Sequence, residues 1–321
     1  MTLATNPKEW MWEQKFRPQT LSECILPEKD IARFAGIIKE GRIPNILLSS
    51  KSPGTGKTTM AHALCNEVDA NVMFISGGEL RINDLRTTLT QFASGMTMKP
   101  GGNVIIIDEG DNKGMREVHA ELRSWMEAYS HNCSVIMTCN NLEAIPDPLQ
   151  SRFRTIEFGN PTETDKLRMM KEMIVRCIKI CEQEGVKVES RKAIAALVKK
   201  NFPDLRGTVT ELDAYGKCGR IDEGVLSQAL RATEDMDDLI NYIKKGQLGE
   251  VRKLLPKFTA DYGNFITSMY NRLFLEVKPT SIRMLVGLIS ENQKTVRDIP
   301  NLEIHIFDLV MNLAGELEFK K

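Results

Sequence analysis

A glycine-rich turn followed by a lysine and two threonines spans residues 53–59, "PGTGKTT". The backbone amides of such a turn can surround phosphate oxygens, the lysine can neutralise their charge, and a threonine hydroxyl can bind Mg²⁺. The turn follows a predicted strand and opens a predicted helix, which is the context in which this motif binds nucleotides. Lys51 replaces the first glycine of the pattern GxxxxGKS/T, at the position farthest from the phosphates. We therefore expect Lys57 to bind the β and γ phosphates and Thr58 to bind Mg²⁺.

Polar groups also follow two later predicted strands. Asp108 ends the apolar run "NVIIID" and Glu109 follows it, while Asn140 comes directly after "SVIMTC". Asp108 can hold Mg²⁺ through water, Glu109 can polarise an attacking water, and Asn140 can orient that water beside the γ-phosphate. Asp111 completes a DExD-like sequence, and we expect it to stabilise the turn. Together these residues predict ATP hydrolysis. The extra strand before Asp108, and Glu109 itself, disfavour a small-molecule kinase.

The first half of the chain predicts the sheet that must hold these residues. Short, β-branched apolar runs alternate with segments of helical periodicity, as in buried parallel strands joined by crossover helices. The predicted strands are residues 45–50, 72–76, 103–108, 134–139 and 155–158. Beyond them Thr162 or Thr164 can cap a helix, and we expect helices at residues 163–185, 190–201, 205–215 and 224–231, then amphipathic helices through 236–318. The fold class is α/β with helical domains, divided at residues 1–158, 159–232 and 233–321.

Composition limits the function classes. The 321 residues carry 43 basic and 43 acidic side chains, so any nucleic-acid contact must be local. No signal peptide and no apolar stretch of membrane-spanning length is found, so we expect no membrane partner and a cytoplasmic location. Seven cysteines without a CxxC pair favour a reducing compartment. Cys177 and Cys181 are expected to pack in a core rather than bind a metal, and the scattered histidines do not predict zinc.

Several stretches, in this order, resemble the clamp-loader ATPases of the AAA+ superfamily: "EQKFRPQTLSECILP", "SPGTGKTT", "DEGD", "LRSWMEAYS", "TCNN", "PLQSRF" and "FPDLRGTVTELD". The resemblance covers essentially the whole chain. It is to the small subunits of replication factor C and in particular to the large ATPase subunit of the T-even bacteriophage clamp loader. It implies an AAA+ P-loop ATPase domain with a parallel five-stranded sheet, a small helical lid and an all-helical collar through which subunits oligomerise.

The resemblance also implies roles for individual residues. Asn140 is the first sensor, and Arg206 is the second sensor within the same chain. Arg152 in "SRF" is the arginine finger of a neighbouring subunit's site, with Arg154 as the alternative; Phe153 replaces the family's usual cysteine, which affects local packing. Arg123 is an interface arginine, with a helix-surface ion pair as the alternative. The expected catalytic residues are Lys57, Glu109, Asn140, Arg152 and Arg206. The expected ATP-binding residues are Glu13, Lys15, Phe16, Arg17, Pro18, Ile25, Pro53, Gly54, Thr55, Gly56, Lys57, Thr58, Thr59, Asn140 and Arg206.

Two further surfaces are expected from the resemblance. We expect Arg81, Arg86 and Arg116 to contact the phosphates of primer-template DNA without regard to its sequence. The alternative is that they are solvated, as lone arginines on helices usually are. We expect Phe92, Met96 and Met98 to contact the ring-shaped clamp, and the alternative is that they pack in the core.

The function implied is that of a clamp-loader ATPase subunit, with ATP and Mg²⁺ as cofactors. It assembles with copies of itself and a non-identical clamp-loader subunit, opens the clamp when ATP is bound and releases it closed on DNA after hydrolysis. Its location is then the host cell cytoplasm if it comes from a bacteriophage. One alternative is an AAA+ helicase loader or related remodeller, which does not need "SRF" together with a helical collar. A non-hydrolysing stator subunit is the other, and Lys57, Glu109 and Asn140 argue against it.

Overall fold

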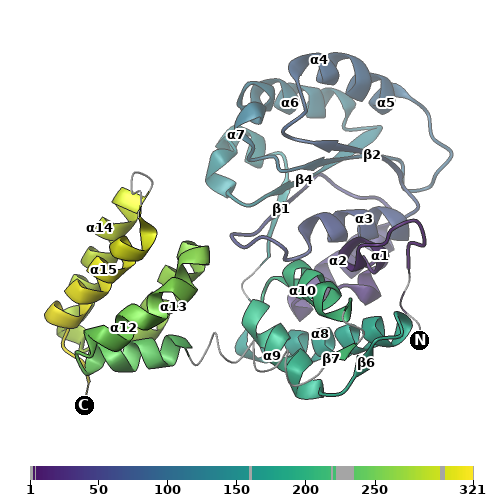
Figure 1. Ribbon diagram of the computed structural model, residues 1–321. Coiled ribbons are helices and arrows are strands. Elements are labelled where there is room, and N and C mark those ends of the chain that lie inside the picture. Colours follow the sequence, from purple (N-terminus) through teal and green to yellow (C-terminus); the bar gives the residue numbers. More distant parts are fainter. Residues whose placement is uncertain are drawn as a thin grey trace. The chain divides into compact units, whose positions relative to one another are not determined.

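The computed structural model forms two compact units, residues 1–226 and 227–321 (Figure 1). The residues that it describes are 3, 5–158, 161–217, 220–221, 235–296 and 301–320. The expected helix at 224–231 and the expected boundaries after residues 158 and 232 lie wholly or partly outside this described part. The division into three domains therefore stays a prediction.

A five-stranded parallel sheet forms the centre of the first unit, which confirms the expected α/β class. The strands lie in the order β2-β3-β4-β1-β5. Their bounds are β1 Ile46–Ser49, β2 Asn71–Ser76, β3 Asn103–Asp108, β4 Cys133–Cys139 and β5 Arg154–Glu157. Because all strands run the same way, the carboxyl ends of β1, β3 and β4 meet at one edge, where ligands of open α/β sheets bind.

Helices cover both faces of this sheet, since neighbouring residues of a strand point to opposite faces. Ile46 and Leu48 of β1 pack in a core with residues of α2 (Glu28–Glu40) and α3 (Lys57–Glu67), whereas Leu47 between them packs in the core that contains Leu122 of α6 (Arg116–Tyr129). Shorter helical segments complete the layers: α1 Trp12–Lys15, η1 Leu21–Glu23, α4 Ile82–Asp84, η2 Leu85–Leu89, α5 Thr90–Ser94, η3 Lys113–Met115, η4 Leu142–Ala144 and α7 Asp147–Gln150.

Among the described residues of this unit, three helices follow the sheet close to the expected positions: α8 Glu163–Gln183, α9 Arg191–Asn201 and α10 Leu205–Gly216. Thr162 caps α8 in a capping box with Asp165. Cys177 and Cys181 are fully buried in a core shared with Trp12 and Phe16 of the N-terminal segment. A two-stranded parallel pair, β6 Lys187–Val188 and β7 Arg220–Ile221, was not expected, because two-residue strands carry no periodic signal.

The second unit is helical, as expected. A helical segment at residues 235–244 is followed by α12 Leu248–Leu254, η5 Leu255–Asp261, α13 Tyr262–Glu276, η6 Pro279–Ser281, α14 Ile282–Thr295 and α15 Leu302–Glu316. Residues such as Leu239, Met269, Leu285 and Leu309 form its own buried core. Within the described residues, no helix is long and apolar enough to cross a membrane.

Candidate nucleotide site

The glycine-rich turn connects β1 to the first residue of α3. Gly54 has a φ of +68° and Gly56 a φ of +93°, values that side chains rarely tolerate. Gly56 is the N-cap residue of α3, so the unpaired amides of the helix start face the turn. Helix amides and dipole together favour a phosphate at this place.

Lys57 and Asn140 meet above this turn. The Lys57 ammonium donates a hydrogen bond to Asn140 Oδ1 at 2.8 Å and to the Ser52 carbonyl at 3.4 Å. Burial lowers the pKa of Lys57, while the nearby groups of Cys139, Asp108 and Asp111 act in the opposite direction. The structure thus brings together two expected site residues that are 83 positions apart.

Asp108 accepts two hydroxyl hydrogen bonds at the end of β3. Thr58 Oγ1 donates to Asp108 Oδ1 at 2.7 Å, and Thr138 Oγ1 donates to the same oxygen at 2.5 Å. The Thr58 hydroxyl and the Asp108 carboxylate are the hard oxygen donors that Mg²⁺ prefers, so this pair fits the expected ion. Thr138 was not among the expected residues, although it lies in the stretch "TCNN" that carried the resemblance.

Glu109 stands exposed beside this pair with an unusual backbone conformation. Its φ of +56° lies in the left-handed region, which is uncommon for a residue other than glycine and occurs at functional sites. Its N–H donates to Thr138 Oγ1 at 3.1 Å. Thr138 therefore holds both the Asp108 carboxylate and the Glu109 backbone, and the carboxylate of Glu109 extends from the fixed turn.

Asp111 acts on the next turn rather than on the Mg²⁺ pair. Its carboxylate accepts hydrogen bonds from the backbone amides of Asn140 at 3.1 Å and Asn141 at 2.8 Å. It thereby fixes the turn from which the Asn140 side chain extends. This arrangement agrees with the turn-stabilising role expected of Asp111.

A pocket adjoins the glycine-rich turn between the N-terminal segment and the helices α8 and α10. Most expected ATP-binding residues line it, and they are Glu13, Phe16, Arg17, Pro18, Ile25, Gly54, Thr55, Gly56, Thr59 and Arg206. Lys15, Pro53, Lys57, Thr58 and Asn140 do not line it. Lys15 instead pairs with Glu184 at 2.5 Å. Residues that the sequence did not single out also line the pocket: Trp12, Gln14, Glu23, Cys24, Leu26, Met173, Arg176, Leu205 and Val209. Sequence reasoning missed the apolar residues among them because, at helical spacing, they cannot be distinguished from ordinary core residues.

The start of α10 lies against the glycine-rich turn. The Gly54 carbonyl accepts from the amides of Leu205 at 3.2 Å and Arg206 at 3.4 Å. Asp204 caps α10 and packs so closely that a Cβ on Gly54 would come 1.7 Å from its Oδ1. Arg206 is thus held beside the turn, with its exposed side chain near the charges of Arg17 and Lys57.

Arg152, Arg154 and Arg123 lie outside this pocket. Arg152 follows α7 and forms an ion pair with Glu127 of α6. Arg154 begins β5, Arg123 lies on α6, and all three are exposed. Phe153, at the position where the resemblance leads us to expect a cysteine, is buried in the hydrophobic core that contains Leu122 and Leu149.

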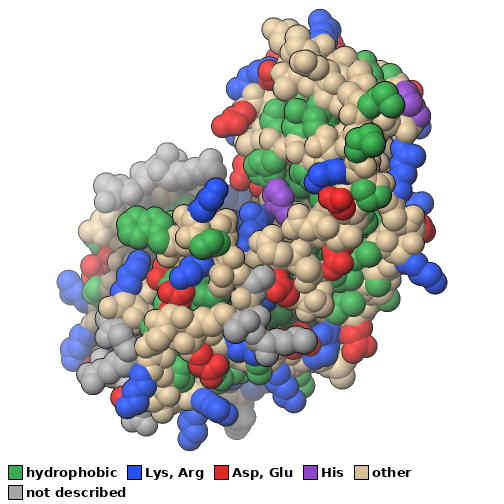
Figure 2. All heavy atoms as spheres, turned by 90° about the vertical axis from the view of Figure 1, so that its right-hand side faces the viewer, with side chains coloured by type: hydrophobic (Ala, Val, Ile, Leu, Met, Phe, Trp, Pro, Cys, Tyr) green, Lys and Arg blue, Asp and Glu red, His purple; other side chains and the backbone are tan. Residues whose placement is uncertain are grey.

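The expected DNA and clamp residues occupy different environments. Arg81 donates to the carbonyls of Gly78 and Leu80, Arg86 pairs with Glu121 at 2.5 Å, and Arg116 is exposed at the start of α6. Met96 and Met98 are fully exposed, whereas Phe92 packs against the core, as in the alternative considered for it. On the face shown in Figure 2, basic and acidic side chains are interspersed, in keeping with the balanced charge.

Comparisons with known proteins agree with this geometry. Residues 47–160 match the model of the ATPase family associated with various cellular activities (AAA). Residues 165–227 and 261–318 match the AAA+ ATPase lid domain and the C-terminal domain of the sliding-clamp-loader large subunit. Among solved structures, the RuvB Holliday junction branch migration motor of Thermotoga maritima shares the fold, with a TM-score of 0.52 at 20% identity over 75% of this chain and 85% of that one.

Some curated proteins are similar to this chain over nearly its whole length, at higher sequence identity than the solved structure above. The sliding-clamp-loader large subunit of Enterobacteria phage T4 is 44% identical over 318 residues, which cover 99% of this chain and 100% of the relative. That of Escherichia phage RB69 is 43% identical with the same coverage. The replication factor C small subunit of Archaeoglobus fulgidus is 31% identical over 83% of this chain and 84% of its own. The chain therefore belongs to the family of sliding-clamp-loader large subunits, and it is an AAA+ ATPase subunit of a clamp loader.

Proposed function

We propose that this chain binds ATP with its phosphates at the glycine-rich turn and its base in the adjoining pocket. The observation that carries the proposal is the meeting of Lys57 with Asn140 and of Thr58 with Asp108 at one edge of the sheet. Thr58 and, through water, Asp108 would hold Mg²⁺ there, and the ion would supply positive charge for the phosphates. Lys57 neutralises the β and γ phosphates, and Arg206 approaches them from the start of α10.

Hydrolysis then needs a base and a further cation. Glu109 is the general base, because its carboxylate extends from a turn fixed by Thr138, and Asn140 orients the water that Glu109 polarises. Arg152 lies on an exposed edge outside its own chain's pocket, so it serves the site of a neighbouring subunit. An arginine supplied across an interface stabilises charge on the γ-phosphate and raises the rate by about 10³-fold or more.

We propose that the free energy of ATP hydrolysis is used to load a sliding clamp. In the proposed cycle, copies of this chain assemble through the helical second unit with a non-identical subunit. The ATP-bound assembly opens a ring-shaped clamp through the Met96 and Met98 loop and binds primer-template DNA through Arg81, Arg86 and Arg116. Hydrolysis releases the closed clamp on DNA. The host cell cytoplasm is the compartment that fits this cycle.

The experiment that tests the assignment mixes two inactive variants, Arg152→Ala and Glu109→Gln, in assemblies with the partner subunit. A subunit with intact Glu109 can receive Arg152 from an adjacent Glu109→Gln subunit, so one complete site is rebuilt and DNA-stimulated ATP hydrolysis returns in part. Arg154→Ala, at the neighbouring exposed arginine, is the matched control and keeps its activity. Mixtures that assemble yet hydrolyse no more ATP than the separate variants, while mixtures with wild type do, would show that Arg152 does not act across the interface.

A further inference from the structure

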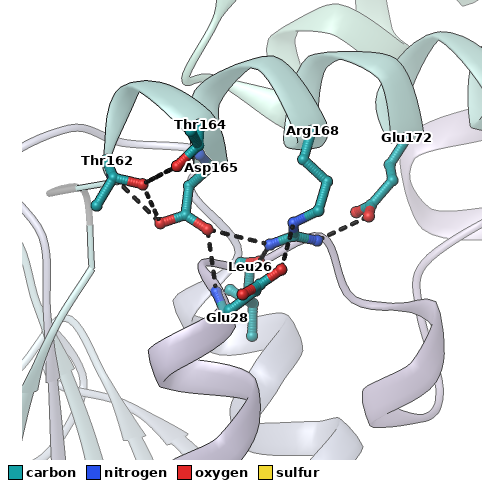
Figure 3. A network of polar contacts seen from close by, with 7 residues as sticks. All are labelled: Leu26, Glu28, Thr162, Thr164, Asp165, Arg168 and Glu172. Carbon is teal, nitrogen blue, oxygen red and sulfur yellow. Dashed lines mark hydrogen bonds and ion pairs between the residues drawn. The ribbon is translucent and has the colours of Figure 1, made fainter.

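Arginine side chains of helix α8 donate hydrogen bonds to backbone carbonyls of the N-terminal segment. Arg168 donates to the Leu26 carbonyl at 2.5 Å and is itself held by Glu172 at 2.7 Å (Figure 3). Beside it, Asp165 accepts from the Glu28 amide at 3.3 Å, at the start of α2. Bonds to a charged donor are stronger than neutral ones, so this helix and the segment are fastened together.

Arg176, further along α8, holds two carbonyls with one guanidinium. Its Nη2 donates to the Phe16 carbonyl at 2.6 Å, and its Nη1 donates to the Glu23 carbonyl at 2.9 Å. The planar fork of arginine suits such a double contact, which lysine cannot reproduce. Burial lowers the pKa of Arg176, and the charge of Glu23 acts in the opposite direction. Arginine side chains are effectively always protonated, so both donors of Arg176 carry a charge-assisted hydrogen bond. One side chain thus closes the loop of residues 16–23.

This closed loop is one wall of the pocket. Phe16, Arg17, Pro18 and Glu23 line the pocket together with Arg176 itself. From within the loop, Arg17 Nε donates to Thr59 Oγ1 at 3.2 Å, in the first turn of α3. A chain of contacts therefore runs from α8 through Arg176 and the loop to the helix that follows the glycine-rich turn.

We propose that Arg176 is a positioning residue that builds the base side of the ATP pocket by fixing residues 16–23 to the lid helix. This inference rests on the proposed placement of the base in this pocket. On the phosphate side, none of the hydrogen bonds that hold the side chains of Lys57, Thr58 and Asp108 involves Arg176 or residues 16–23. Their partners are Ser52 before the glycine-rich turn, Asn140 after β4 and Thr138 in β4, together with the Thr58–Asp108 bond itself. Loss of Arg176 should therefore weaken recognition of the nucleoside and spare recognition of the phosphates.

The test compares two ligands, Mg-ATP and Mg-tripolyphosphate, which shares the phosphates but has no nucleoside. Calorimetry on Arg176→Met should show ATP bound about tenfold or more weakly, the scale of one missing hydrogen bond to a charged group, with tripolyphosphate affinity unchanged. Arg176→Lys keeps the charge and can hold one carbonyl, so its ATP affinity should be intermediate; it also serves if Arg176→Met does not fold. Lys171→Met, which removes an exposed cation from the same helix, should change neither affinity.

In the full assembly, both Arg176 variants should raise KM for ATP and leave kcat within about twofold, because Glu109 and Arg152 are untouched. Equal losses for ATP and tripolyphosphate would overturn the inference, since they would mean a general loss of the fold around the site. Unchanged ATP affinity in Arg176→Met would overturn it as well. A wild-type chain that binds neither ligand would instead refute the proposed site as a whole.

Discussion

Lys57→Met removes the cation that we propose binds the ATP phosphates, while it keeps most of the side-chain stem. Lys57 is only 8% exposed, and its ammonium is 2.8 Å from Asn140 Oδ1. At about 4 Å from a phosphate charge and an effective dielectric constant of about 20, one pair of unit charges is worth about 4 kcal/mol. That energy corresponds to about a 10³-fold change in the dissociation constant. We therefore expect ATP binding by Lys57→Met to fall below the range of an ordinary calorimetric titration.

The matched control is Lys51→Met, which removes an exposed lysine just before the same turn. Because this side chain stands at the position farthest from the phosphates, we expect its ATP affinity to stay within about twofold of wild type. Lys51→Met should melt close to wild type because Lys51 is exposed, whereas Lys57→Met should melt lower because it loses the hydrogen bonds of Lys57 to Asn140 and Ser52. An affinity of Lys57→Met close to that of wild type would refute the placement of the phosphates. Equal losses in the two variants would show that only the general charge of the turn matters.

Three more predictions concern other residues. Glu109→Gln should bind ATP almost normally but hydrolyse it on the order of 10²-fold or more slowly, since it loses only the base; weakened nucleotide binding would assign Glu109 a structural role. Single neutralisation of Arg81, Arg86 or Arg116 should weaken binding to every primer-template sequence alike and lower the log-log salt slope by about one for each phosphate that the side chain no longer binds, and unchanged affinity and slope in all three would place the DNA surface elsewhere. Burial raises the pKa of the Cys177 thiol to about 12, so between about pH 8.5 and 12 the folded chain holds a proton that the unfolded chain loses, and the free energy of unfolding should fall with rising pH by up to about 1.4 kcal/mol per pH unit for this thiol. Urea unfolding across pH 8 to 10 should show that the free energy of unfolding declines less steeply with pH in Cys177→Ala than in wild type. An identical decline in both would contradict the raised pKa of the Cys177 thiol.

The sequence by itself determined the parts that are encoded locally. A phosphate-binding turn is a run of adjacent residues, and buried parallel strands are recognisable as short apolar runs, so the glycine-rich turn and all five strands of the sheet were predictable. Asp108, Glu109 and Asn140 were also predictable as site residues, because they come at the ends of β3 and β4 and the carboxyl ends of parallel strands share one edge. Resemblance added the residues of the N-terminal segment and Arg206, most of which line the pocket.

Only the tertiary structure decided which groups meet. The strand order places β4 between β3 and β1, which lets Thr138 bind the Asp108 carboxylate and Asn140 meet Lys57. Phe92 lies in an exposed-looking stretch but packs on the core, because burial depends on elements distant in sequence. Arg176 is one more cation on an amphipathic helix until the fold sets it between two carbonyls. A backbone carbonyl is present at every residue and leaves no signature in the sequence, so such contacts become visible only when the chain has folded.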